Sequence, residues 1–185
     1  ADTKRLEASA ISGPGPRPRQ VAAGVDPRQR QRRARAARGT DLPVILVDAN
    51  VLIYAYHPRG EPHAACRRWL ETTFSGLTPV GLPWLSIWAF LRISTNPRAF
   101  EQPLGMREAR DIVATWLDLS VVRMLEPGER HWDILSQLLT DAQVTGPLVT
   151  DAALAALALE HGASVCTLDR AFFRCQGLTV IDPSE

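Results

Sequence analysis

Three aspartates in the sequence stand where an α/β protein could bring them together. Asp48 directly follows an apolar run that begins at Val44. Asp169 follows a second apolar segment, and Asp151 lies at the start of an Ala/Leu-rich stretch. The carboxyl ends of parallel strands share one edge of a sheet, where ligands bind. Clustered carboxylates favour a hard cation, Mg²⁺ with Mn²⁺ as a substitute, which could activate water against a phosphodiester.

Each aspartate also has a simpler interpretation. Asp is common at strand ends and helix starts, where its carboxylate caps amides and complements the helix dipole. Capping is the better interpretation for any one of the three alone, whereas three at one edge favour a metal site. Other chemistries fit worse, because the sequence has no G-x-x-x-x-G-K-[ST] loop, no G-x-G-x-x-G and no G-x-S-x-G motif.

Alternating strand and helix patterns must position these aspartates. From Val44 onward, short apolar runs alternate with helical periodicity, which predicts an α/β three-layer sandwich with a mainly parallel central sheet flanked by helices. Pro62 and Pro83 suit helix starts, and Gly162 suits a C-cap. We expect strands at 44–47, 77–82, 121–125, 164–167 and 178–181, and helical segments at 50–56, 62–74, 84–94, 106–117, 129–139, 148–161 and 169–174.

Several large apolar side chains fall on helical stripes. Met106 and Leu117 share the stripe of the helix at 106–117, and Trp132 lies on that of the next helix, so all three are expected to face inward. Trp84 and Trp88 lie four residues apart on one helix face. We interpret this pair as core or dimer packing rather than as a platform for RNA bases.

Charge divides the chain into two parts. Residues 1–43 carry ten Lys/Arg against four Asp/Glu, and residues 44–185 carry eleven against sixteen. The first part, rich in Pro and Arg, is predicted to be a disordered basic leader, and the second a folded domain. The leader could touch RNA phosphates, but a solvated tail is the favoured interpretation.

Location follows from absent signals. No apolar run is long enough to cross a membrane, and no secretory signal opens the sequence. The three cysteines are widely spaced and suit a reducing compartment. A cytoplasmic protein without a membrane partner is therefore expected.

Four segments resemble, in order, the signatures of the PIN domain of VapC-type toxins. They are Val47–Ala55, Leu82–Arg98, Gly146–Ala158 and Thr167–Phe172, and the resemblance covers about residues 44–183. The family consists of small Mg²⁺-dependent endoribonucleases, usually the toxin half of a bacterial toxin–antitoxin pair. The resemblance implies that Asp48, Asp151 and Asp169 hold the metal and that the enzyme cuts structured RNA such as tRNA or rRNA.

The same resemblance implies supporting residues and partners. Asn50 and Thr167 match positions that hold the carboxylates by hydrogen bonding. Arg92 and Arg98, in the second signature, are the candidates for contact with RNA phosphates. A homodimer and a cognate antitoxin that inserts a segment into the active-site groove are also implied.

Two positions depart from the family pattern. Ala89 stands where the second signature normally has a glutamate, and Ala171 where the fourth often has an aspartate. Three carboxylates with water can still hold one Mg²⁺, although more weakly. A ribonuclease toxin is the leading hypothesis. The alternative is a PIN-like module that binds RNA or antitoxin with weakened or lost catalysis, and a basic-tailed RNA-binding protein is a third.

Overall fold

The protein folds around one five-stranded sheet. The computed structural model describes residues 43–58, 61–141 and 143–185, so the predicted leader lies outside the described residues except for Pro43. All neighbouring strands are parallel, in the order β3-β2-β1-β4-β5, which confirms the predicted α/β class. The strands are β1 Ile45–Val47, β2 Val80–Pro83, β3 Val122–Leu125, β4 Ser164–Cys166 and β5 Val180–Ile181.

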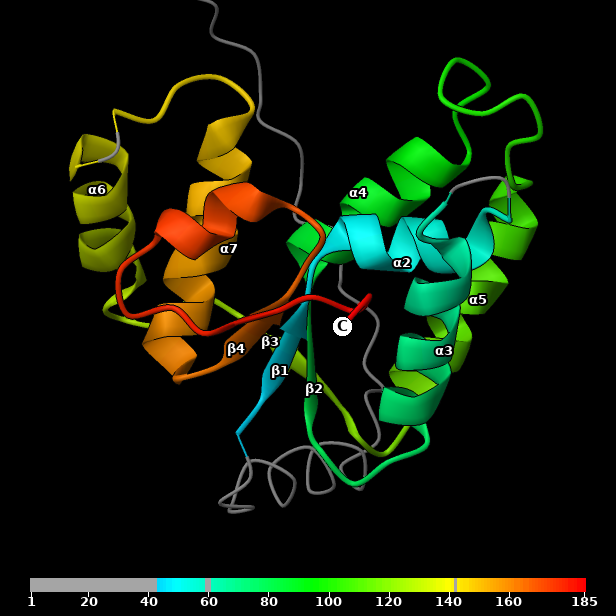
Figure 1. Ribbon diagram of the computed structural model, residues 1–185, viewed down its shortest axis with the longest axis horizontal. Coiled ribbons are helices and arrows are strands. Elements are labelled where there is room, and N and C mark those ends of the chain that lie inside the picture. Colours follow the sequence, from blue (N-terminus) through cyan, green and yellow to red (C-terminus); the bar gives the residue numbers. More distant parts are fainter. Residues whose placement is uncertain (1–42, 59–60, 142) are drawn as a thin grey trace, which may run out of the picture. The chain divides into compact units, whose positions relative to one another are not determined.

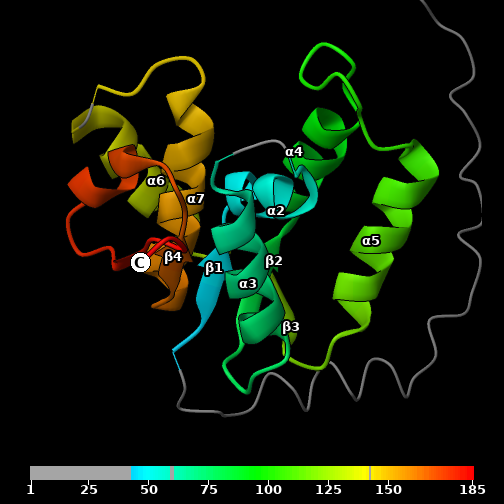
Figure 2. The ribbon, with the colours of Figure 1, turned by 45° about the vertical axis from the view of Figure 1, so that its right-hand side comes forward.

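Helices cover both faces of the sheet. One group, α2 to α5, lies on one side, and α6, α7 and η1 lie on the other (Figures 1 and 2). They are α2 Ala49–Tyr56, α3 His63–Phe74, α4 Trp84–Ser94, α5 Met106–Asp118, α6 His131–Asp141, α7 Leu148–His161 and the 3₁₀ helix η1 Arg170–Arg174. Among the residues that the structure describes, no helix combines the length and the apolar character that a membrane crossing needs.

The helix boundaries follow local chemistry. Pro83 precedes the first residue of α4 with an extended backbone, and Gly162 ends α7 in the left-handed conformation at φ 61°. A residue without Cβ adopts that conformation without strain. Both boundaries lie where the sequence predicts them.

The two faces of the sheet have separate apolar cores. Val47 packs with Phe90 and Trp116 under α2 to α5, whereas its neighbour Leu46 packs with Phe172 and the buried side of α7. Successive residues of a strand point to opposite faces, so the short strand β1 serves both cores. β1 is therefore buried on both sides, as predicted.

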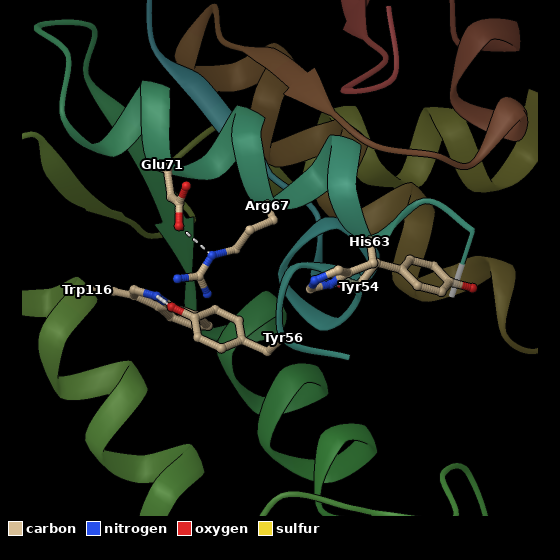
Figure 3. Close-up of polar contacts among 6 residues, drawn as sticks. All are labelled: Tyr54, Tyr56, His63, Arg67, Glu71 and Trp116. Carbon is tan, nitrogen blue, oxygen red and sulfur yellow. Dashed lines mark hydrogen bonds and ion pairs between the residues drawn. The ribbon is translucent and has the colours of Figure 1, made fainter. Parts of the chain in front are cut away.

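Polar contacts also join α2, α3 and α5 (Figure 3). The Trp116 indole N–H donates to the Tyr56 hydroxyl at 3.1 Å, and the Arg67 guanidinium lies 5.2 Å from the centre of the Tyr56 ring. Arg67 also pairs with Glu71 at 2.5 Å along α3. These contacts link the three helices of this layer through Tyr56.

Several predicted core residues are exposed instead. Met106 is 60% exposed and Trp132 is 68% exposed, and Leu117 also lies at the surface. The reason for Trp132 is that α6 packs on α7, and none of its residues is fully buried. Periodicity identifies the apolar face of a helix but not how much of that face a neighbour covers.

The tryptophans of α4 are also not core residues. Trp88 is 61% exposed, Trp84 is 41% exposed, and their rings stack with centres 6.3 Å apart. The core interpretation of this pair is wrong. The buried face of α4 is formed by Ser86, Ile87, Phe90 and Ser94 instead.

Candidate active site

Asp48 lies immediately after β1, at the carboxyl edge of the sheet. Its backbone N–H donates to the Cys166 carbonyl on β4 at 3.0 Å, which continues the ladder one residue past the strand. β4 ends at Cys166, so the next residue along, Thr167, faces Asp48. The sheet thus brings two segments more than a hundred residues apart into contact, as the parallel arrangement predicts.

The Thr167 hydroxyl joins the site. It donates to Asp48 Oδ2 at 2.7 Å and accepts from Asn50 Nδ2 at 2.9 Å and from the Asp169 N–H at 3.0 Å. One donor and two acceptor positions are all that a hydroxyl offers, so this buried group is fully used. The structure therefore brings Asp48, Asn50, Thr167 and Asp169 into one network, with the hydroxyl oriented toward Asp48.

Asn50 is fixed from its other end as well. Its side-chain oxygen accepts from the Leu168 N–H at 3.3 Å. The amide thus bridges α2 to the segment that follows β4, and its NH₂ group points to Thr167. The chain of bonds from Asn50 through Thr167 to Asp48 holds the carboxylate in one orientation.

Asp169 has a capping role in addition to its place in the site. Its carboxylate accepts from the Ala171 N–H at 2.8 Å at the start of η1. Asp48, by contrast, makes no side-chain capping bond to α2, although it precedes that helix. Asp169 thus caps η1 with a hydrogen bond of good geometry, whereas the Ala49 and Asn50 amides at the start of α2 favour the charged form of Asp48 without such a bond.

Asp151 approaches the other two aspartates from α7. Burial and, to a smaller extent, the charges of Asp48 and Asp169 together raise the pKa of its carboxyl to about 6. Burial also raises the pKa of Asp48, while the Thr167 hydroxyl and the nearby amides lower it and Asp169 raises it. The three aspartates thus lie close enough for their charges to repel, which is the convergence that the sequence predicts.

The oxygen chemistry of this site suits a hard divalent cation. Carboxylates that lie close together repel, and a positive ion between them relieves this repulsion. Within the described ranges, however, no group of three or more His, Cys, Asp or Glu side chains is placed so that it could hold a metal ion by itself. Mg²⁺ is usually held by one or two carboxylates with several waters, so the residues fit a water-rich ion better than a cage of protein ligands.

Ala89 and Ala171, at the two positions where the family pattern has an acid, contribute no carboxylate to the site. Ala89 is half-buried on α4 and packs against the core under α2 to α5. Ala171 contributes its backbone N–H to Asp169 but offers no side-chain oxygen. Any ion here would depend on the three aspartates and on solvent.

The two arginines predicted to contact phosphate are at the surface. Arg92 lies in the last turn of α4, and Arg98 follows in the loop, where its backbone N–H donates to the Asn96 side chain at 2.9 Å. Both side chains are exposed. Arg92 is eight residues from the start of α4, or about 12 Å along the helix axis. It is not among the groups that shift the pKa of Asp48 or Asp151.

A cavity opens beside Asp151. It has a volume of about 650 Å³ between α6, α7 and η1, and its apolar walls include Ile134, Leu138 and Phe172. Asp151 and Arg174 are among the polar residues at this cavity. Sequence reasoning missed it, because it arises from the incomplete contact of α6 with the rest of this layer.

Sequence reasoning also missed a residue, Ser86. It is 2% exposed in the first turn of α4, and its hydroxyl donates to the Val47 carbonyl at 2.8 Å, immediately before Asp48. The available signal was Pro83, which has no N–H and stands in a strand that the topology places inside the sheet.

Comparisons with known proteins agree with this architecture. The model of the PIN domain family matches residues 45–178. Ribonuclease VapC37 of Mycobacterium tuberculosis is 41% identical over 133 residues, which is 72% of this chain and 92% of that protein. Ribonuclease VapC43 of the same species is 38% identical over 135 residues, covering 73% of this chain and 92% of that protein.

Solved structures share the fold at low sequence identity. VapBC2 from Rickettsia felis, bound to a DNA fragment from its promoter, aligns with a TM-score of 0.56 and 12% identity over 75% of this chain and 97% of that chain. Mycobacterium tuberculosis VapC20, described as a toxin that cleaves the sarcin-ricin loop, aligns with a TM-score of 0.54 and 17% identity over 70% of this chain and 92% of that chain.

Proposed function

Because the chain belongs to the PIN domain family and groups with the VapC ribonucleases, we propose that it is a metal-dependent endoribonuclease and the toxin of a toxin–antitoxin pair. The observation that carries this proposal is the convergence of Asp48, Asp151 and Asp169, expressed in the raised pKa of Asp151. Capping accounts for the position of Asp169, but it does not account for the approach of Asp151 to Asp48 and Asp169.

We propose that the three aspartates hold Mg²⁺, for which Mn²⁺ can substitute. When bound, the ion polarises the phosphodiester and makes its bound water a better nucleophile. The protein's part is to orient the oxygens. Asn50 and Thr167 hold Asp48, the Ala171 N–H holds Asp169, and Asp151 closes the site from α7. Arg92 and Arg98 contact substrate phosphates outside this centre, and the substrate is structured RNA, tRNA or rRNA.

Cleavage of RNA in Mg²⁺ or Mn²⁺ by the full chain tests this proposal. Asp48→Ala and EDTA should each abolish cleavage. Asp133→Ala is a matched control, because Asp133 is also an acid in the first turn of a helix but lies on α6 and is exposed. Cleavage that survives Asp48→Ala or EDTA would contradict the mechanism.

A second candidate function is a binding module with weakened catalysis. The alanines at 89 and 171 and the open arrangement of the carboxylates favour it. Ala89→Glu should then raise cleavage strongly from a near-zero baseline. Full activity of the unmodified protein would exclude this candidate.

We further propose that the protein is a homodimer in the cytoplasm and that α4 lies in the dimer contact. The stacked, exposed rings of Trp84 and Trp88 support this, because a solvated tryptophan pair leaves a large apolar area in water. Trp88→Lys should shift sedimentation toward a monomer. Trp132→Lys, which changes another exposed tryptophan on α6, should leave the dimer intact.

The proposed partner is a cognate antitoxin that inserts a segment into the active-site groove. Several structures of similar fold are described as VapBC complexes, which supports the expectation for this chain. Addition of the antitoxin should stop cleavage at one antitoxin per active site. Activity that persists at saturating antitoxin would contradict inhibition at the groove.

A further inference from the structure

Pro83 leaves a gap in the hydrogen bonding of the central sheet. β2 lies between β3 and β1, yet its last residue is a proline, which has no N–H. Proline is normally confined to edge strands or strand ends, where the missing donor faces solvent or a bend. Here β2 has a strand on each side, so the missing N–H leaves a buried carbonyl of a neighbouring strand without its backbone donor.

The register identifies that acceptor as the Val47 carbonyl. Ile45 pairs with Val80, and its N–H donates to the Pro79 carbonyl at 3.0 Å, so Ile45 faces β2. In a parallel ladder every second residue faces the same neighbour, and Val47 therefore also faces β2. In this register the backbone N–H of residue 83 would donate to the Val47 carbonyl, and Pro83 has no N–H.

Ser86 supplies the donor that Pro83 lacks. Its hydroxyl donates to the Val47 carbonyl at 2.8 Å, and both residues are buried, at 2% and 0% exposure. A buried carbonyl without a partner is unfavourable, because nothing replaces the hydrogen bonds that it made to water. The first turn of α4 thus replaces one rung of the sheet with a side-chain bond.

This bond bears directly on the candidate active site. The Val47 carbonyl belongs to the peptide group whose N–H is that of Asp48, and this N–H donates to the Cys166 carbonyl on β4 at 3.0 Å. The peptide plane before Asp48 is consequently held on both sides, by α4 and by β4. Thr167 then fixes the carboxylate itself.

We propose that Ser86 is a positioning residue for Asp48, which acts by holding the Val47–Asp48 peptide in place of the missing Pro83 N–H. The inference rests on the proposed function in one respect, the role of Asp48 in binding metal. A purely structural role, in which Ser86 only anchors α4 to the sheet, is the competing explanation.

The experiment compares two serines of α4 that make the same kind of bond. Ser94 is also buried, and its hydroxyl donates to the Phe90 carbonyl of its own helix at 2.6 Å rather than to a carbonyl of β1. Ser86→Ala and Ser94→Ala each remove one buried hydroxyl from the full chain. Mn²⁺ affinity by titration, RNA cleavage and thermal unfolding are measured for both.

We expect Ser86→Ala to weaken Mn²⁺ binding by about tenfold or more, in the range typical for groups that orient metal ligands. Ser86→Thr keeps the hydroxyl and should retain the affinity. Ser94→Ala should lower the melting temperature but leave Mn²⁺ affinity unchanged. Restoring the backbone donor with Pro83→Ala in the Ser86→Ala background should recover part of the affinity, and this double variant carries the test if Ser86→Ala alone does not fold.

Equal Mn²⁺ affinity of Ser86→Ala and Ser94→Ala would overturn the proposal, as would a folded double variant that recovers stability but no affinity. Asp48→Ala distinguishes a failure of the proposed function from a failure of the proposed role of Ser86. If Asp48→Ala binds Mn²⁺ like the unmodified protein, the proposed function fails. If Asp48→Ala loses Mn²⁺ and Ser86→Ala does not, only the role of Ser86 fails.

Discussion

Asp48 and Asp151 belong to the same candidate site but are held in different ways. Asp48 follows the central strand, and its backbone and carboxylate are bonded to β4, to Thr167 and, through Val47, to Ser86. Asp151 lies in the first turn of α7, and nothing in the described part of the chain donates a hydrogen bond to its carboxylate. It also borders a cavity of about 650 Å³.

The difference indicates that the two carboxylates have different roles in binding an ion. A carboxylate fixed from several sides can hold an ion in one place, whereas a carboxylate beside open space can adjust to it. The positions of the acids are consistent with this, because the charges of Asp48 and Asp169 raise the pKa of Asp151 although no three acids of the described residues are placed to hold an ion by themselves. We expect ion binding to move Asp151 toward Asp48 rather than the reverse.

The largest expected difference between the two acids is in the rate of cleavage after each is lengthened by one methylene, to Glu. Asp48→Glu pushes the carboxylate against the fixed Thr167 hydroxyl, and a displacement of about 1 Å in a catalytic group can lower the rate by about 10²-fold. Asp151→Glu has room beside the cavity and should lose less than about tenfold by the same reasoning. Single-turnover RNA cleavage measures both. Equal losses would contradict the division between a fixed and an adjustable acid.

A smaller effect is expected from removing the group that fixes Asp48. Thr167→Val keeps the shape of the side chain but leaves Asp48, Asn50 and the Asp169 N–H without their shared partner. Mn²⁺ affinity measured by titration should fall by about tenfold, the lower end for groups that orient metal ligands.

Thr95→Val is the matched control for Thr167→Val. The Thr95 hydroxyl donates only to the Leu91 carbonyl of its own helix at 2.7 Å, remote from the aspartates. Its loss should leave Mn²⁺ affinity unchanged. If Thr167→Val binds Mn²⁺ as tightly as Thr95→Val, the hydroxyl network does not position Asp48.

Much of this site could be predicted from the sequence, because parallel strands end at one edge. That rule alone places Asp48 beside Thr167 and Asp169, and the helical pattern from Leu148 adds Asp151. Boundaries set by local chemistry, such as Pro83 before α4 and Gly162 after α7, were predictable for the same reason. They depend on residues next to each other in the chain.

The remaining features depend on how layers pack, which local patterns do not contain. Trp132 lies on an apolar stripe, yet α6 contacts too little of the protein to cover it. Ser86 resembles any serine in a helix until the register places its hydroxyl against Val47. The cavity beside Asp151 arises in the same way. Sequence reasoning therefore found the acids and, through the family resemblance, Asn50 and Thr167 beside Asp48. It did not find the Ser86 bond behind Asp48 or the cavity beside Asp151.

The smallest expected effect is on stability, and it depends on pH. The pKa of Asp151 is raised from an ordinary 3.8 to about 6, so the native protein holds this proton more tightly than the unfolded chain does. The resulting stability is fully present below about pH 4 and is lost as the pH rises through about 6. Asp151→Asn, a neutral side chain of the same shape, should therefore unfold at a higher temperature than the unmodified protein at pH 7.5 in EDTA, by a few degrees.

This stabilisation should disappear at pH 4, where Asp151 is itself neutral. Mg²⁺ provides the opposite test at pH 7.5, because an ion that needs the carboxylate should stabilise the unmodified protein and not Asp151→Asn. Asp141→Asn, at an exposed acid that lines the same cavity, should show neither effect. The melting temperatures of the three proteins are measured by circular dichroism at both pH values. Parallel pH profiles for Asp151→Asn and the unmodified protein would mean that Asp151 does not carry the repulsion that an ion is proposed to relieve.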